Sequence, residues 1–321
     1  TTKPAQSPTK IGVLDSDADG FTDRLYAGDT GGNLWRVDMP GSTISEWSVF
    51  KLASLGGADT SANDRRFFNQ PKIVRALITE TIESTLDVYD AETDTTVTTT
   101  QIDQFKKPYD AILLGSGDVT NPLGTDTEDK FFMIKDELIV TQTMTEALTP
   151  DVVLIDDLKD YTDNPFQDLE GDALQAEQLL ASTKSGWYID FELSGEKSMA
   201  SAAVISGVAY FNSFTPAAPP ETGEVCSAED GGAAFYAVDL ALGTKIYDNR
   251  RIEIGYNPPG EPTFVTIDDP DFVPDPDNPD AEVPQVMAVI APDVKPLCSG
   301  AACPGSDRFQ TKRTYLYTTE N

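Results

Sequence analysis

The sequence predicts an all-β protein, on three observations. Turn-forming residues are abundant, with 23 Gly and 22 Pro, and short apolar or alternating runs lie between them, as in strands joined by turns. Strand–turn–strand units also recur at wide spacing along the chain. Finally, helical periodicity is confined to one stretch, residues 163–183, and predicts a single short helix there. The apolar positions at helical spacing in that stretch are Leu169, Ala173, Ala176 and Leu180.

The repeated unit is an apolar strand followed by a turn and a second apolar strand. The first three units end on Asp38, Asp136 and Asp239. Their sequences are "RLYAGDTGGNLWRVD", "DAILLGSGD" with "DKFFMIKD", and "GVAYFNSF" with "GGAAFYAVDLALGTKIYD"; "RTYLYTTEN" begins a fourth. Small antiparallel sheets repeated in this way are typical of propeller blades. The units are about twice as far apart as the roughly 40–50 residues usual for blades, so long insertions are expected.

We therefore predict a β-propeller fold in which residues 1–321 supply about four blades of a larger ring. The approximate blades are residues 9–65, 66–140, 184–250 and 251–321, and the insertions are 76–105, 141–183 and 268–284. The Thr-rich alternation within the first insertion predicts an exposed hairpin. The Pro-rich acidic run of the last predicts an irregular loop. Because so few blades seldom close a ring, we expect others from the N-terminal side or from another chain.

The charge of the chain excludes several classes of function. The formal net charge is −31, and there is no histidine. Such a negative field repels phosphate backbones and anionic lipids, so we expect no nucleic-acid partner. No apolar run is long enough to cross a bilayer, so we expect no membrane insertion. Without histidine the chain cannot form a Ser-His-Asp triad or a histidine-based zinc site. Carboxylate chemistry and the binding of hard cations remain.

The three cysteines give a weaker indication of compartment. Cys298 and Cys303 lie five positions apart in "CSGAACPG" and fit a small disulfide loop, which would imply an oxidising compartment. Cys226 is then unpaired or paired outside this segment.

The clearest site motif is "DSDADGFTD", residues 15–23. Asp15, Asp17 and Asp19 occupy positions 1, 3 and 5 of an EF-hand-type loop, Phe21 position 7 and Asp23 position 9, with glycine at position 6. Alternate side chains point to one centre, the glycine permits the sharp turn, and position 7 supplies its carbonyl oxygen. We predict a Ca²⁺ site formed by four carboxylates and this carbonyl.

The alternative is a metal-free aspartate-rich turn, since aspartate favours turns. Four carboxylates crowded together without a cation would repel one another, which favours the metal site. The loop also departs from an EF-hand, because position 12 is Tyr26 and a strand follows instead of a helix. No catalytic residue is predicted: acidic pairs are numerous and nothing selects one, and the Gly-rich turns "GDTGGN" and "GSGD" lack the features of a phosphate loop.

These motifs resemble those of the PilC/PilY family, calcium-dependent adhesins and biogenesis factors at the tip of bacterial type IV pili. The most specific is "DSDADGFTDRLYAGDTGGNLWRVDM"; the others, in order, are "RRFFNQPKIV", "YDAILLGSGDVTNPL", "FFMIKD" and "GWYIDFELSGEKSMASAAVISGVAYFNSFTP". The resemblance implies a modified propeller and the calcium ligands Asp15, Asp17, Asp19, the Phe21 carbonyl and Asp23. It also implies that the chain is the C-terminal half of such a domain, without the earlier blades and the adhesive region.

The resemblance further implies a non-enzymatic protein at the cell surface or pilus tip, which passes through the periplasm. Calcium would control pilus assembly and surface adhesion, and the partners would be minor pilins, the remaining blades, and host or abiotic surfaces. Two alternatives remain open: a structural subunit of an extracellular filament or matrix, and a propeller-fold oxidoreductase.

Overall fold

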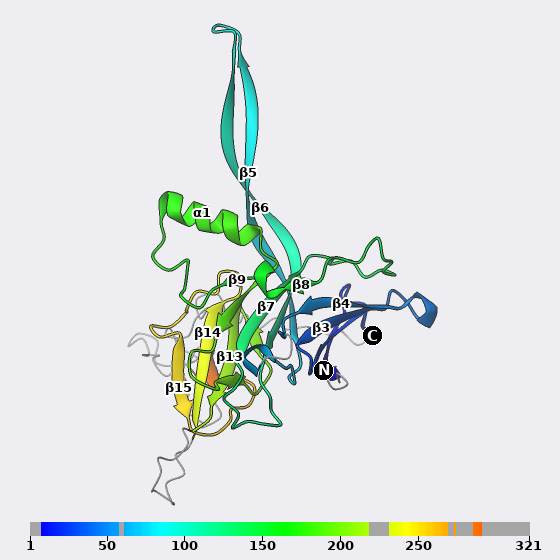
Figure 1. Cartoon of the computed structure of the whole chain (residues 1–321), viewed down its shortest axis with the longest axis vertical. Helices are drawn as coiled ribbons and strands as arrows, with labels where there is room; N and C mark the ends of the chain where they lie inside the picture. Colours follow the sequence, from blue (N-terminus) through cyan, green and yellow to red (C-terminus); the bar gives the residue numbers. More distant parts are fainter. Residues whose placement is uncertain (1–7, 58–60, 218–230, 269–272, 274–284, 291–321) are drawn as a thin grey trace, which may run out of the picture. The chain divides into compact units, whose positions relative to one another are not determined.

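In the part of the chain that the structure describes, most of the regular structure is antiparallel sheet, as Figure 1 shows. The computed structural model describes residues 8–57, 61–217, 231–268, 273 and 285–290. Two compact units are distinguished, Thr1–Glu261 and Pro262–Asn321. In the described residues the first unit holds three five-stranded sheets, here called sheets A, B and C, and the second holds a two-stranded sheet. This confirms the predicted all-β class.

Sheet A is an antiparallel meander with a short parallel strand added at one edge. Its strands, in spatial order, are β1 (Pro8–Leu14), β2 (Arg24–Asp29), β3 (Asn33–Asp38), β4 (Ser48–Ser54) and β8 (Val153–Leu154). The β2–β3 turn is held by the Asp29 carboxylate, which accepts the N–H groups of Gly31 (2.8 Å) and Asn33 (2.9 Å). Gly32 has φ +75° there, and a Cβ at this position would lie 2.4 Å from the Cα of Gly56. Gly32 of "GDTGGN" therefore serves the turn.

Sheet B repeats this plan with longer strands. In spatial order it contains β5 (Lys72–Asp90), β6 (Thr95–Gly115), β7 (Lys130–Asp136), β10 (Gly186–Asp190) and β9 (Lys159–Asp160), the last pairing in parallel. The predicted boundaries placed residues 186–190 in the blade 184–250, but β10 pairs with β7. The chain thus leaves sheet B after β7 and returns to it. Gly186 permits the return, because a Cβ there would lie 2.0 Å from the Met133 carbonyl oxygen.

Sheet C and the second unit complete the described strands. Sheet C contains β11 (Lys197–Ser198), β12 (Ala203–Ile205), β13 (Val208–Thr215), β14 (Gly232–Asp239) and β15 (Arg251–Gly255). The predicted fourth blade began at residue 251, but β15 pairs with β14 and closes sheet C. In the second unit β16 (Thr263–Asp268) pairs with β17 (Gln285–Ile290). The predictions for Cys226, Cys298, Cys303, residues 313–321 and most of 268–284 lie outside the described residues.

The predicted short helix is present as α1 (Gly171–Ser182). It lies within the segment between β7 and β10, which also contributes the edge strands β8 and β9 to two different sheets. Short 3-10 helices occur at Ile44–Glu46, Ser61–Asn63 and Ile155–Asp157. The predicted insertion 141–183 therefore also links sheets A and B.

Sheet B is the central layer of the core, with both faces covered. Alternate residues of β7 point in opposite directions: Phe131 and Met133 belong to an apolar cluster shared with sheet C, and Phe132 and Ile134 to one shared with sheet A. Phe131 stacks on Phe211 of β13. Every residue of β7 is buried, which explains why "FFMI" is continuously apolar where a half-exposed strand would alternate.

The long strands β5 and β6 form a two-stranded ribbon that extends away from the sheets (Figure 1). Beyond its base the side chains are mostly exposed, among them Leu86 (58 %) and Tyr89 (61 %). The hairpin expected from the Thr-rich alternation is therefore present. Between Glu80 and Phe105 the ribbon carries seven carboxylates and no basic residue, so like charges surround its exposed apolar side chains.

We expect the outer ribbon to be dispensable for folding. Joining Glu83 to Ile102, which are opposed in the register, through an Asn-Gly turn removes only exposed or half-buried side chains. The thermal midpoint of unfolding should change by less than about 3 °C. A deeper cut that joins Ile78 to Lys107 is the comparison, because it removes Thr81, whose N–H donates to Ser182 Oγ of α1 at 2.9 Å. That variant should melt clearly lower, and equal losses in both variants would contradict the prediction.

Candidate metal centre

The acidic loop connects the first two strands of sheet A. The β1–β2 ladder holds its ends together, since Leu14 is opposed to Arg24. The Asp23 N–H donates to the Leu14 carbonyl oxygen at 2.9 Å, and the Met39 N–H donates to the Asp23 carbonyl oxygen at 2.8 Å. The loop is therefore a closed excursion from a regular hairpin, and its conformation depends on its own contacts.

The loop brings three of the predicted ligands together. One carboxylate oxygen each from Asp15, Asp17 and Asp19 lie within 4.8 Å of one another, and all three residues are exposed. In the ranges that the structure describes, no other three acidic or cysteine side chains converge in this way. Two oxygens bound to one Ca²⁺ at roughly 2.3–2.6 Å can be at most about 5 Å apart. The spacing of the three carboxylates therefore fits a shared calcium ion.

Backbone N–H groups wind the loop around its first aspartate. The Asp15 carboxylate accepts the N–H groups of Ala18 (2.7 Å) and Gly20 (2.9 Å). The Asp19 carboxylate accepts the N–H of Phe21 at 2.8 Å. Gly20 has φ +92° and Ala18 has φ +64°. The chain therefore turns sharply at the predicted glycine, which adopts a positive φ without strain.

Asp23, the fourth predicted carboxylate ligand, lies differently. Asp23 is not one of the three grouped carboxylates: its Oδ2 accepts both the N–H and the hydroxyl of Ser16, each at 2.6 Å. Burial alone would raise the pKa of Asp23, but the hydrogen bonds from Ser16 outweigh it and lower the pKa. Asp23 thus ties the end of the loop to its start. Phe21 is 75 % exposed, and its carbonyl oxygen stays a predicted calcium ligand.

The loop is also anchored to sheet B. Arg75 of β5 donates from Nη1 to the Ser16 carbonyl oxygen (3.0 Å) and from Nε to Asp110 (2.9 Å). The hydrogen bond with Asp110 raises the pKa of the Arg75 guanidinium. Arg24, where β2 begins, donates to the same carboxylate at 2.8 Å. The position of the acidic loop is therefore coupled to the contact between sheets A and B.

A buried ionic network, which sequence reasoning missed, continues from this anchor. Arg36 donates to Asp38 through Nε (2.7 Å) and Nη2 (2.6 Å), and to Asp136 through Nη1 (2.7 Å). Tyr26 donates its hydroxyl to Asp136 at 2.8 Å. Two of the unit-ending aspartates noted in the sequence thus belong to this network. The third, Asp239, caps a turn by accepting the N–H groups of residues 241 and 242.

These features define an all-β protein of successive blade-like sheets with an acidic loop in its first hairpin. The fold is similar to that in the crystal structure of the Pseudomonas aeruginosa PilY1 C-terminal domain, with a TM-score of 0.52 and 16 % sequence identity over 91 % of this chain. The chain spans 60 % of the length of that domain. The likeness shows that the two chains share a fold. This is the fold that the PilC/PilY resemblance of the sequence motifs implies.

Comparison of the sequence with family models and with curated proteins yields no match. In the part of the chain that the structure describes, no helix is long and apolar enough to cross a membrane.

Proposed function

We propose that this chain is a calcium-binding part of a type IV pilus-associated protein, and that it acts by binding and not by catalysis. The observation that carries the proposal is the convergence of Asp15, Asp17 and Asp19 in a closed loop, on a fold similar to the PilY1 C-terminal domain. The family resemblance of the loop and strand motifs supports the pilus assignment. The protein would act outside the cell at the pilus tip, with minor pilins and further blades as partners.

The physical role of a bound cation follows from the contacts of the loop. The three carboxylates are exposed and close together, so they repel one another, and Ca²⁺ would supply the charge that removes this repulsion. Ordering of the loop would reach sheet B through the Ser16–Arg75–Asp110 contacts. Calcium would thereby stabilise the contact between sheets A and B, which is how it could control assembly with pilins or adhesion to a surface.

We expect one calcium ion to bind with the wild-type chain, as measured by calorimetric titration. Asp17→Ala with Asp19→Ala should abolish the heat of binding, because two of the three grouped carboxylates are lost. Glu146→Ala with Asp151→Ala is the matched control: it removes the same charge from an exposed loop and should bind as the wild type does. At calcium 100-fold above Kd the stability should rise by about 2.7 kcal/mol, and only in the wild type and the control.

Equal binding by all three proteins would show that calcium is held by diffuse charge and not by the loop. The pilus assignment is tested separately, by co-purification of the chain with minor pilins in calcium and in chelator. Calcium binding without any pilin association would retain the metal site and reject the pilus role.

A further inference from the structure

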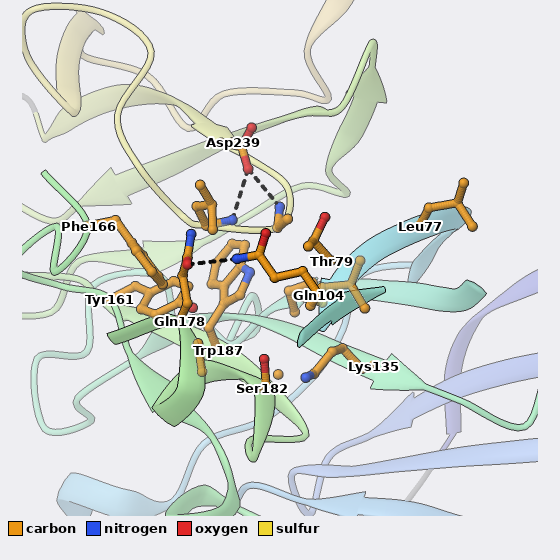
Figure 2. A pocket seen from close by; sticks show the side chains of 16 residues that line it. Leu77, Thr79, Gln104, Lys135, Tyr161, Phe166, Gln178, Ser182, Trp187 and Asp239 are labelled. Atoms are coloured by element: carbon orange, nitrogen blue, oxygen red, sulfur yellow. Dashed lines mark hydrogen bonds between the residues drawn. The ribbon is translucent and has the colours of Figure 1, made fainter. Parts of the chain in front are cut away.

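A cavity lies at the base of the β5–β6 ribbon, apart from the acidic loop. Its volume is about 380 Å³, within the range of sites for small ligands. Figure 2 shows that its lining comes from the ribbon, α1 and strands of sheets B and C. Three aromatic side chains form one wall: Tyr161 stacks on Trp187 with 5.8 Å between ring centroids, and Phe166 meets Tyr161 edge-on at 5.6 Å. The wall therefore offers flat apolar surface.

The polar groups around this wall are mostly satisfied within the protein. Trp187 donates its indole N–H to the Leu240 carbonyl oxygen at 2.9 Å. Gln104 of the ribbon donates to Gln178 of α1 at 3.2 Å. Asp239 at the rim accepts two backbone N–H groups. None of these groups needs a ligand.

Lys135 is the exception. It lines the cavity from the end of β7, and the residue is 6 % exposed. Its Nζ is covered and has no hydrogen-bond acceptor among the residues that the structure describes. Figure 2 shows the side chain directed toward Ser182 of α1. Glu80 and Glu137, whose negative charges act on Lys135, are bound by Lys107. Burial lowers the pKa of Lys135. A buried ammonium without an acceptor is unfavourable. The cavity therefore lacks a hydrogen-bond acceptor for Lys135, which a ligand could supply.

A second donor without an acceptor lies on the same face of sheet B. Tyr109 is 1 % exposed and its hydroxyl has no partner. It lines an adjoining cavity that shares Leu77, Asp239 and Ala241 with the first. A lysine ammonium can only donate hydrogen bonds and a tyrosine hydroxyl can donate one, so an acceptor that enters these cavities would satisfy either group.

We propose that this cavity binds a small aromatic monocarboxylate, with its carboxylate on Lys135 and its ring against Tyr161, Phe166 and Trp187. A carboxylate only accepts hydrogen bonds and carries the charge that an ammonium requires. The lysine gives up no hydrogen bond when its flexible chain rotates into the cavity, because it makes none. The rim carboxylate of Asp239 disfavours ligands with a second negative charge. The proposal is independent of the calcium site.

The test compares two probes of the same shape, 3-phenylpropionate and the neutral 3-phenylpropanamide, by ligand-observed NMR titration in 150 mM NaCl. The salt screens the overall negative charge of the chain. We expect the acid to bind the wild type at least tenfold more tightly than the amide. Lys135→Met should weaken binding of the acid at least tenfold and leave the amide unchanged. Lys106→Met removes the same charge from an exposed lysine of β6 and should bind the acid as the wild type does.

A thermal melt without probe separates a ligand role from a structural one. Lys135→Met should melt higher than the wild type, because it removes a buried charge without a partner and keeps the apolar stem. If that variant fails to fold, the comparison of acid and amide on the wild type decides the question. The proposal is overturned by equal affinity for acid and amide, by no binding of the acid up to 10 mM, or by undiminished binding in Lys135→Met.

Discussion

Replacing Arg36 with methionine should lower the free energy of unfolding by about 3–5 kcal/mol. The Arg36 side chain is fully buried and bridges Asp38 in its own sheet to Asp136 in sheet B. Burial by itself would lower the pKa of this guanidinium, but the hydrogen bonds that it donates to Asp38 and the charge of Asp136 raise it. Methionine fills much of the same volume, so the loss measures charge and hydrogen bonding more than packing. Two buried carboxylates would be left without their main donor.

Urea unfolding of the wild type and of two comparison variants measures this effect. Arg66→Met breaks the exposed pairs with Asp64 and Asp118, where the arginine side chain is 36 % exposed, and should cost no more than about 1 kcal/mol. Arg36→Lys keeps a charge but loses the planar bidentate contact with Asp38, so its loss should be intermediate. A loss for Arg36→Met as small as that for Arg66→Met would mean that the network does not hold sheets A and B together.

The contrast between the acidic loop and this network shows what local sequence can predict. In the loop, all the groups that converge lie within nine residues, and alternate spacing with a glycine is enough to bring Asp15, Asp17 and Asp19 together. In the network, the partners lie about a hundred positions apart: Arg36 and Asp136 meet only because sheet A packs on sheet B. Alternation along a strand indicates which residues share a face, but not what covers that face.

The predicted assignment of two strands to blades was wrong for the same reason: strand pairing depends on contacts between distant parts of the chain. The helix and the hairpin are set by local periodicity and were predicted, whereas the pairing of β10 with β7 and of β15 with β14 depends on where the chain returns. Lys135 is a related case. A lysine near the end of an apolar strand normally reaches solvent, but this one is 6 % exposed and lines a cavity with residues of α1 and the ribbon, which are distant in sequence.

The second large effect is expected from Asp129, whose carboxyl group should make stability fall as the pH rises. The residue is 2 % exposed; Oδ1 accepts the Ser116 hydroxyl at 2.6 Å, and Oδ2 has no donor. Burial raises its pKa to about 6, against the lowering effects of the Ser116 hydrogen bond and of Lys197 and Arg65. Because this is above the unfolded value of 3.8, the folded state binds the proton more tightly. The contribution of Asp129 is therefore most favourable below pH 4.

Between pH 4 and pH 6 this contribution is lost, because the unfolded carboxyl ionises while the folded one still holds its proton, and the loss is on the order of 3 kcal/mol. Asp129→Asn keeps an acceptor for Ser116 and cannot ionise, so its stability relative to the wild type should rise across this window and level off above it. Urea unfolding at pH 4, 5, 6 and 7 measures the difference between the two proteins, from which the titration of the other carboxylates cancels. Glu146→Gln, at an exposed position, should follow the wild type throughout. If the difference in stability between Asp129→Asn and the wild type stays constant with pH, the prediction is wrong. The buried carboxylate would then be stabilised as an ion, by hydrogen-bond donors to Oδ2 other than those of the residues that the structure describes.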